Sequence, residues 1–130
     1  MEFYKAAFGA TELYRLDGPN GTVGHAEMKI RDAVFMLADE NPEWGNKSPE
    51  SLGGTPTGLL LYVEDVDADV AQALAAGATV KMPVKDQFYG DRSGSVIDPF
   101  GHHWMLATHI EDVSPEEMNR RFQEMMKGQG

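Results

Sequence analysis

The sequence contains no cysteine, so its fold needs no disulfide and thiol chemistry is excluded. It also has no apolar run near the roughly 18 residues of a membrane-spanning helix. Residues 1–4 lack the basic start and the long apolar stretch of a secretory signal. These absences predict a cytoplasmic protein with no membrane partner.

Basic residues are scarce: 11 Lys and Arg stand against 21 Asp and Glu, which gives a formal charge of -10. They form no basic stripe, so we do not expect nucleic acid as a partner. This acidity favours solubility, and it would also raise the local concentration of a cationic ligand. With 130 residues, 42% of them apolar, the chain is long enough for one domain with its own core.

The first third of the chain predicts one helix and three strands. Phe3, Tyr4 and Phe8 fall on one helical stripe within residues 2–8, and Gly9 suits the left-handed position after a helix end. A short strand, a turn of hairpin chemistry and two further strands follow at residues 14–16, 17–21, 23–30 and 33–38.

The second half repeats this order after a long connection. Residues 40–56 are rich in Gly, Pro, Ser and Asn, and connections of that length are usually functional or mobile. The apolar run 57–63 predicts a strand buried on both faces, and Asp65 or Asp67 is expected to cap the next helix. The remaining strands are predicted at 79–82, 95–97 and 103–109. A capping box that starts at Ser114 opens a closing helix at 114–127.

Two short matches indicate that the halves are copies of one unit. Phe-Gly-Ala-Thr at residues 8–11 matches Ala-Gly-Ala-Thr at 76–79, and Met-Leu-Ala at 36–38 matches Met-Leu-Ala at 105–107. The two offsets differ by a single residue. A duplicated α+β unit of this size is expected to cover one face of its sheet with its helix.

Several segments are similar to one protein family. Residues 2–10, 63–67, 86–94 and 98–102 resemble the vicinal-oxygen-chelate (glyoxalase/bleomycin resistance protein/dioxygenase) superfamily, and within it the PhnB-like branch. The most specific part is Gln-Phe-Tyr-Gly-Asp-Arg-Ser-Gly followed by Asp-Pro-Phe-Gly-His. The resemblance implies an α+β fold in which two βαβββ modules form a curved mixed sheet around a cleft, and often a homodimer.

Under this resemblance residues 1–130 form a single domain. Module one covers residues 1–39, the connection 40–56, module two 57–109 and the C-terminal helix 114–127. The family has a strand before the first helix, whereas this chain starts inside that helix. We expect an unpaired edge beside strand 57–63. Either residues before Met1 supply the strand, or a loop or a neighbouring chain fills the gap, in which case the homodimer would exchange strands.

Metal-using relatives take their ligands from the first and last strands of each module. The resemblance puts one of these positions before the chain and the others on Met36, Thr57 and Met105. Thioether and hydroxyl groups are poor ligands for hard or borderline divalent cations, which favour carboxylate and imidazole. We therefore predict no metal and no other cofactor at these positions.

A displaced metal site is the alternative. Strand alternation puts His25 and Glu27 on one face of their strand, and His103 shares parity with Met105. Imidazole and carboxylate together are acceptable ligands for zinc or iron. A divalent-metal-dependent lyase, isomerase or dioxygenase would use this set. The simpler interpretation is that His25 and Glu27 bond each other or serve as polar contacts in the cleft.

The predicted cleft has an apolar floor and aromatic walls, as ligand sites often do. Thioether and aliphatic residues would form the floor, and aromatic residues of two loops the walls, although these aromatics would equally suit loop packing or a dimer interface. Arg92 forms an ion pair, clamps the backbone or contacts a substrate anion. The full predicted set is His25, Glu27, Met36, Trp44, Thr57, Leu59, Phe88, Tyr89, Arg92, His103 and Met105.

No nucleophilic triad, phosphate loop or dinucleotide fingerprint is visible. The main hypothesis is a metal-free small-molecule-binding protein, like the drug-sequestering members of the superfamily, with a cationic aromatic compound as a fitting ligand. The metal-dependent enzyme and a scaffold module that acts by association remain as alternatives. Whether any reaction is catalysed stays open.

Overall fold

The computed structural model describes residues 1–128 and runs twice through a helix followed by three strands. The first half contains α1 (Glu2–Phe8), β1 (Thr11–Asp17), β2 (Val23–Ile30) and β3 (Ala33–Leu37). The second half contains β4 (Gly58–Tyr62), α3 (Val66–Ala75), β5 (Thr79–Asp86), β6 (Asp91–Ile97) and β7 (His103–His109). Helix α4 (Pro115–Lys127) follows, and the short elements are η1 (Pro19–Gly21), η2 (Pro42–Trp44) and α2 (Pro49–Leu52).

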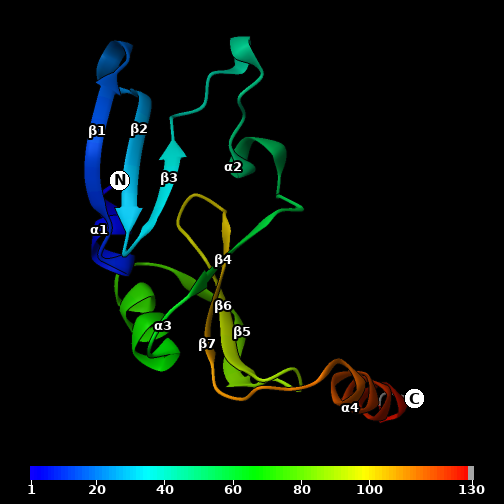
Figure 1. The fold of residues 1–130 in the computed structure, drawn as a ribbon. Helices are drawn as coiled ribbons and strands as arrows, with labels where there is room; N and C mark the ends of the chain where they lie inside the picture. The colour runs from blue at the N-terminus through cyan, green and yellow to red at the C-terminus, as the bar shows by residue number, and fades with distance from the viewer. Residues whose placement is uncertain (129–130) are drawn as a thin grey trace.

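The strands form two sheets. Sheet one is antiparallel with the order β1-β2-β3, and sheet two has the order β4-β7-β6-β5, in which β4 runs parallel to β7. Within residues 1–128 no ladder joins the sheets. Figure 1 shows them in different parts of the molecule, with α4 projecting beyond the end of sheet two. The fold is therefore mixed α+β, as predicted, with one separate sheet in each half.

Helix boundaries follow the predicted local signals. Gly9 adopts φ 67 after α1, in the left-handed region that suits glycine. The Asp65 carboxylate accepts a 3.1 Å hydrogen bond from the Ala68 N–H and caps α3. The Ser114 hydroxyl accepts a hydrogen bond from the Glu117 N–H at the start of α4. No helix among the described residues is long and apolar enough to span a membrane.

One hydrophobic core joins the two halves. Helices α1 and α3 pack against each other, and both contribute to a single buried cluster with residues of both sheets. Its members include Phe3, Tyr4, Ala7, Met28, Ile30, Val66, Val70, Ala73, Val96, Trp104 and Leu106. Each sheet consequently has one face on the core and an opposite face, which we call its open face.

Strands β4, β5 and β6 differ from the prediction. Strand β4 is exposed along most of its length rather than buried on both faces, because it lies at the edge of sheet two with only one face on the core. Strand β5 continues to Asp86 and β6 already begins at Asp91, whereas strands 79–82 and 95–97 with a loop between them were predicted. Gly94 explains part of this: a Cβ there would lie 2.8 Å from the Val84 side chain, so a glycine-containing segment that looks like a loop is a tightly packed strand.

Candidate functional site

The open face of sheet two is defined by its register. Leu60 of β4 pairs with Met105 of β7, and Met105 pairs with Ser95 of β6, so these three side chains share one face. Trp104 and Leu106, the neighbours of Met105, point the other way into the core. His103 and Met105 therefore lie on the same face, which confirms their predicted parity.

A pocket of about 510 Å³ opens at the end of sheet two where β4 and β7 begin. We call it the sheet-two pocket. Its volume lies within the range of small-molecule sites. It is lined by Thr55, Pro56, Thr57, Gly58, Leu59, Leu60, Lys81, Met82, Ser95, His103, Trp104 and Met105. Four predicted cleft residues, namely Thr57, Leu59, His103 and Met105, therefore gather at one pocket.

The floor position differs by one residue from the prediction. Leu59 pairs with Trp104, whereas Leu60 pairs with Met105 and shares its face. Because side chains alternate along a strand, Leu60 is the leucine that stands beside Met105 on the open face. The register of β4 against β7 decides which leucine faces the pocket. The continuous apolar run in the sequence does not indicate this register.

Strands β5, β6 and β7 contribute Lys81, Ser95 and His103 to the polar lining of the sheet-two pocket, beside Thr55 and Thr57, which precede β4. Lys81 Nζ lies 2.9 Å from His103 Nδ1. Because an ammonium can only donate, this contact makes Nδ1 the acceptor and leaves the proton of the neutral imidazole on Nε2. The Ser95 hydroxyl is buried and has no hydrogen-bond partner among the described residues. An apolar floor with few polar groups is typical of ligand sites.

His25, Glu27 and Met36 lie on the open face of sheet one. Glu27 pairs with Met36 in register, accepts a 3.2 Å hydrogen bond from the Tyr14 hydroxyl, and lies 4.0 Å from His25 Nε2. The expected proximity of His25 and Glu27 is present. Met36 is 67% exposed and does not line the sheet-two pocket.

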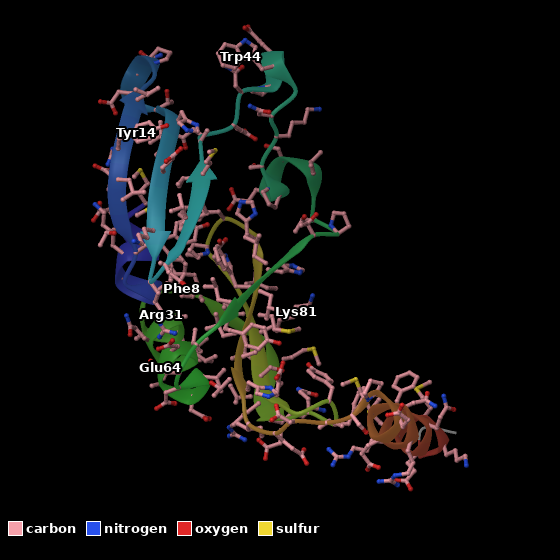
Figure 2. The ribbon with its side chains drawn as sticks, in the orientation of Figure 1. Phe8, Tyr14, Arg31, Trp44, Glu64 and Lys81 are labelled. Carbon is pink, nitrogen blue, oxygen red and sulfur yellow. The ribbon has the colours of Figure 1, made fainter. Side chains whose placement is uncertain are left out.

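Trp44 lies far from sheet two in this chain. It belongs to η2 at the tip of the connection and is 77% exposed. Figure 2 shows Trp44 and Tyr14 in the region of sheet one, with Lys81 in the region of sheet two. Trp44 and His25 line a different pocket of about 590 Å³ between the connection and the first hairpin. Trp44 therefore does not form a wall of the sheet-two pocket.

Phe88 and Tyr89 pack their loop instead of lining the sheet-two pocket. The Phe88 ring lies 5.6 Å from the Phe122 ring of α4 and 5.1 Å from the Tyr89 ring, centroid to centroid. Arg121 donates a 3.1 Å hydrogen bond to the Phe88 carbonyl. Loop packing is one of the roles that the sequence leaves open for these aromatics.

Arg92 forms ion pairs on the side of α3. Its guanidinium donates to both Asp67 oxygens at 2.8 and 3.0 Å, and to Asp86 at 2.9 Å. The hydrogen bond from Arg92 lowers the pKa of Asp67. Arg92 alternates with Ser93 along β6 and is absent from the sheet-two pocket. The ion-pair interpretation is confirmed. Because of its strand parity, Arg92 points away from the sheet-two pocket, and its contact with a substrate anion stays a prediction.

A polar network at the opposite end of sheet two was not predicted. Asp91 is 6% exposed; its carboxylate accepts a 2.7 Å hydrogen bond from the Tyr62 hydroxyl and lies 3.1 Å from His109 Nδ1. His109 Nε2 lies 2.7 Å from Asp112. The hydrogen bonds to Asp112 and Asp91 raise the pKa of His109. Since both imidazole nitrogens are engaged, the network ties strands together and leaves no ring nitrogen free.

The residues at the family's metal positions do not fit a divalent cation. Met36 and Met105 offer thioethers, and Thr57 offers a single hydroxyl. The alternative set is divided: His25 and Glu27 belong to sheet one, and His103 belongs to sheet two with its Nδ1 beside Lys81. Within residues 1–128 no three His, Asp or Glu side chains gather as a metal site.

The chain is an α+β protein built from two similar modules, each a helix followed by three strands. The modules share one core, and the sheet of each has an open face. Residues 1–106 match the sequence model of the Glyoxalase/Bleomycin resistance protein/Dioxygenase superfamily, and the chain belongs to this superfamily.

Similar proteins agree with this assignment. An uncharacterized protein of Mycobacterium bovis is 47% identical over 133 residues, which cover 100% of this chain and 85% of that protein. The crystal structure of TioX from Micromonospora sp. ML1 has a TM-score of 0.63 and 27% identity, over 84% of this chain and 86% of TioX. The PhnB protein of Bacillus cereus shares the fold, with a TM-score of 0.61 at 21% identity over 83% and 87% of the two chains.

Proposed function

We propose that this protein binds a small molecule without a metal, in the sheet-two pocket. The observation that carries the proposal is the pairing of Leu60 with Met105 on the pocket floor. Met105 offers a thioether where a metal site would need carboxylate or imidazole, and its neighbour Leu60 adds a second apolar side chain. Methionine adapts its shape and contacts aromatic rings well, so this floor suits an apolar guest.

A neutral apolar dye tests the proposal directly. N-phenylnaphthylamine fluoresces when it leaves water, and Trp104 lines the pocket as an energy donor. The chain has two tryptophans, so Trp44→Phe leaves Trp104 as the sole donor. We expect saturable dye binding with energy transfer from Trp104, unchanged by a chelator or by added zinc. Binding that requires added metal would contradict the proposal.

Matched leucine variants locate the dye. Leu60 and Leu52 are both exposed, but only Leu60 lines the pocket. Leu60→Gln should weaken dye binding about tenfold because it removes apolar floor surface, and Leu52→Gln should leave it unchanged. Equal effects of the two variants would place the dye elsewhere.

We also propose a homodimer. Exposed apolar side chains on the open face of sheet one and on α4 form the kind of surface that marks an interface; they include Tyr14, Val34, Met36, Phe122 and Met126. Strand β4 ends its sheet and has a free edge within residues 1–128, which invites strand pairing with a second copy. Sedimentation equilibrium would test this: a monomer at all accessible concentrations contradicts it.

The acidic charge of -10 and the absence of cysteine support two further parts of the proposal, a cytoplasmic location and no nucleic-acid partner. Nuclease treatment should therefore leave the sedimentation of the purified protein unchanged.

A further inference from the structure

The sheet-two pocket is free of acidic side chains in a strongly acidic chain. The sequence has 21 Asp and Glu against 11 Lys and Arg, yet the pocket lining includes Lys81 and no Asp or Glu. By contrast, the pocket between the connection and the first hairpin is lined by Asp17, Asp39 and other acidic residues. The local charge of the sheet-two pocket is thus opposite to that of the whole chain.

Two side chains of this pocket, Lys81 and His103, present hydrogen-bond donors. Lys81 carries an ammonium, and its contact with His103 Nδ1 places the imidazole proton on Nε2, where it is available to a guest. No carboxylate lies within ion-pair distance of Lys81 among residues 1–128. The charge of Lys81 is therefore not neutralised by an ion pair within the described chain.

The Ser95 hydroxyl is a third hydrogen-bond donor, at the base of the pocket. Ser95 is 6% exposed, its hydroxyl has no hydrogen-bond partner among the described residues, and it pairs with Met105 of the floor. A buried hydroxyl without a partner is energetically disfavoured, so a ligand atom that accepts a hydrogen bond from it would relieve that cost. Met105 and Met82, the residues in register with Ser95, have flexible side chains that can shift to expose it.

We infer that the ligand of the sheet-two pocket is an organic acid: an apolar, ring-containing body with one oxyanionic group held by Lys81, His103 Nε2 and the Ser95 hydroxyl. This inference rests on the proposed function and specifies its ligand class. The inferred ligand is an anion, whereas the acidity of the whole chain predicted a cationic ligand. The local donors outweigh the distant acidic residues because salt screens charges separated by more than about 10 Å.

A pair of dyes that differ by one anionic group tests the inference. Anilinonaphthalene sulfonate carries the skeleton of N-phenylnaphthylamine together with a sulfonate. Charge-assisted hydrogen bonds predict that the sulfonate dye binds about tenfold more tightly than the neutral dye. Binding of the neutral dye with no gain from the sulfonate would overturn the inference and leave the proposed function standing. Failure of both dyes would overturn the proposed function as well.

Variants assign the gain to named groups. Lys81→Met should remove most of the sulfonate preference while neutral-dye binding persists. Lys85→Met is the matched control, because Lys85 also belongs to β5 but does not line the pocket. Ser95→Ala should lower sulfonate-dye affinity several-fold without destabilising the fold, because the hydroxyl has no partner to lose. An equal loss with Lys81→Met and Lys85→Met would indicate a general charge effect and refute the site.

Discussion

The Tyr4 hydroxyl donates a 2.6 Å hydrogen bond to the carboxylate of Asp98, which lies 94 residues further along the chain. The indole N–H of Trp104 donates to the same carboxylate at 2.9 Å, and so do the backbone N–H groups of Phe100 and His102. Asp98 is only 3% exposed, so these donors take the place of water around its charge. The cluster fixes α1 against the turn between β6 and β7.

Tyr4→Phe should lower the free energy of unfolding by about 1–3 kcal/mol, because it removes one donor from a buried carboxylate. Burial and the bond to Asp98 raise the pKa of Tyr4, so it remains a neutral donor throughout the working pH range. Urea denaturation measures the loss. Tyr14→Phe is the control, since its bond to Glu27 is exposed and should matter less. Equal losses of unfolding free energy in the two variants would show that the hydrogen bond to Asp98 contributes no more to stability than the exposed one to Glu27.

Gly90→Ala should be markedly destabilising. Gly90 has φ 98, and a Cβ there would collide with the carbonyl oxygen of Glu111. Gly45 also has a positive φ, of 81, but open space around it. Gly45→Ala should therefore lose only the backbone preference of glycine, roughly 1 kcal/mol, and Gly90→Ala several times more. Thermal unfolding compares Gly45→Ala, which adds backbone strain alone, with Gly90→Ala, which adds strain and a steric clash. Similar melting temperatures of the two variants would contradict the predicted clash.

His109 should titrate above its ordinary value of 6.5, because Asp112 and Asp91 favour its protonated form. A raised pKa in the folded state means that protonated His109 stabilises the fold below 6.5, and that this contribution is lost as the pH rises through the raised value. NMR titration of the imidazole gives the midpoint directly. Asp112→Asn should lower it, and a wild-type midpoint at or below 6.5 would disprove the proposed charge network.

Arg92→Met should leave dye binding in the sheet-two pocket unchanged, within about twofold, because Arg92 pairs with Asp67 and Asp86 away from the pocket. A small loss of stability is expected, since exposed ion pairs contribute little. Fluorescence titration with both naphthylamine dyes measures the effect. If Arg92→Met lost the sulfonate preference as Lys81→Met is expected to, Arg92 would have to contribute to the binding site.

Local signals predicted most of the fold. The stripe of Phe3, Tyr4 and Phe8, the left-handed Gly9 and the Ser114 cap each depend on neighbours within a few residues, and each is confirmed. The exposure of β4 was not predictable in this way. An apolar run indicates burial, but whether both faces are covered depends on which strands lie beside it.

The candidate site was harder to predict because it depends on register and long-range packing. Counting along the strand predicted that Leu59 lies on the pocket floor. The pairing of Leu60 with Met105 shows that Leu60 is the residue on the same face as Met105. The register of β6 against β7 likewise decides which face of the sheet Arg92 occupies, because Arg92 pairs with Thr108. Trp44 and Phe88 lie on loops whose positions follow from distant contacts, so composition alone could not place them.

The connection at residues 40–56 contributes a single buried side chain, that of Pro49, while the core is built from elements on either side of it. A proteolytic nick in this segment would therefore cut the chain without cutting the core. The two fragments should remain associated, because α1 comes from one piece and α3 from the other. Separately produced halves would then reconstitute each other, which makes this connection a natural place to split the protein as a complementation pair.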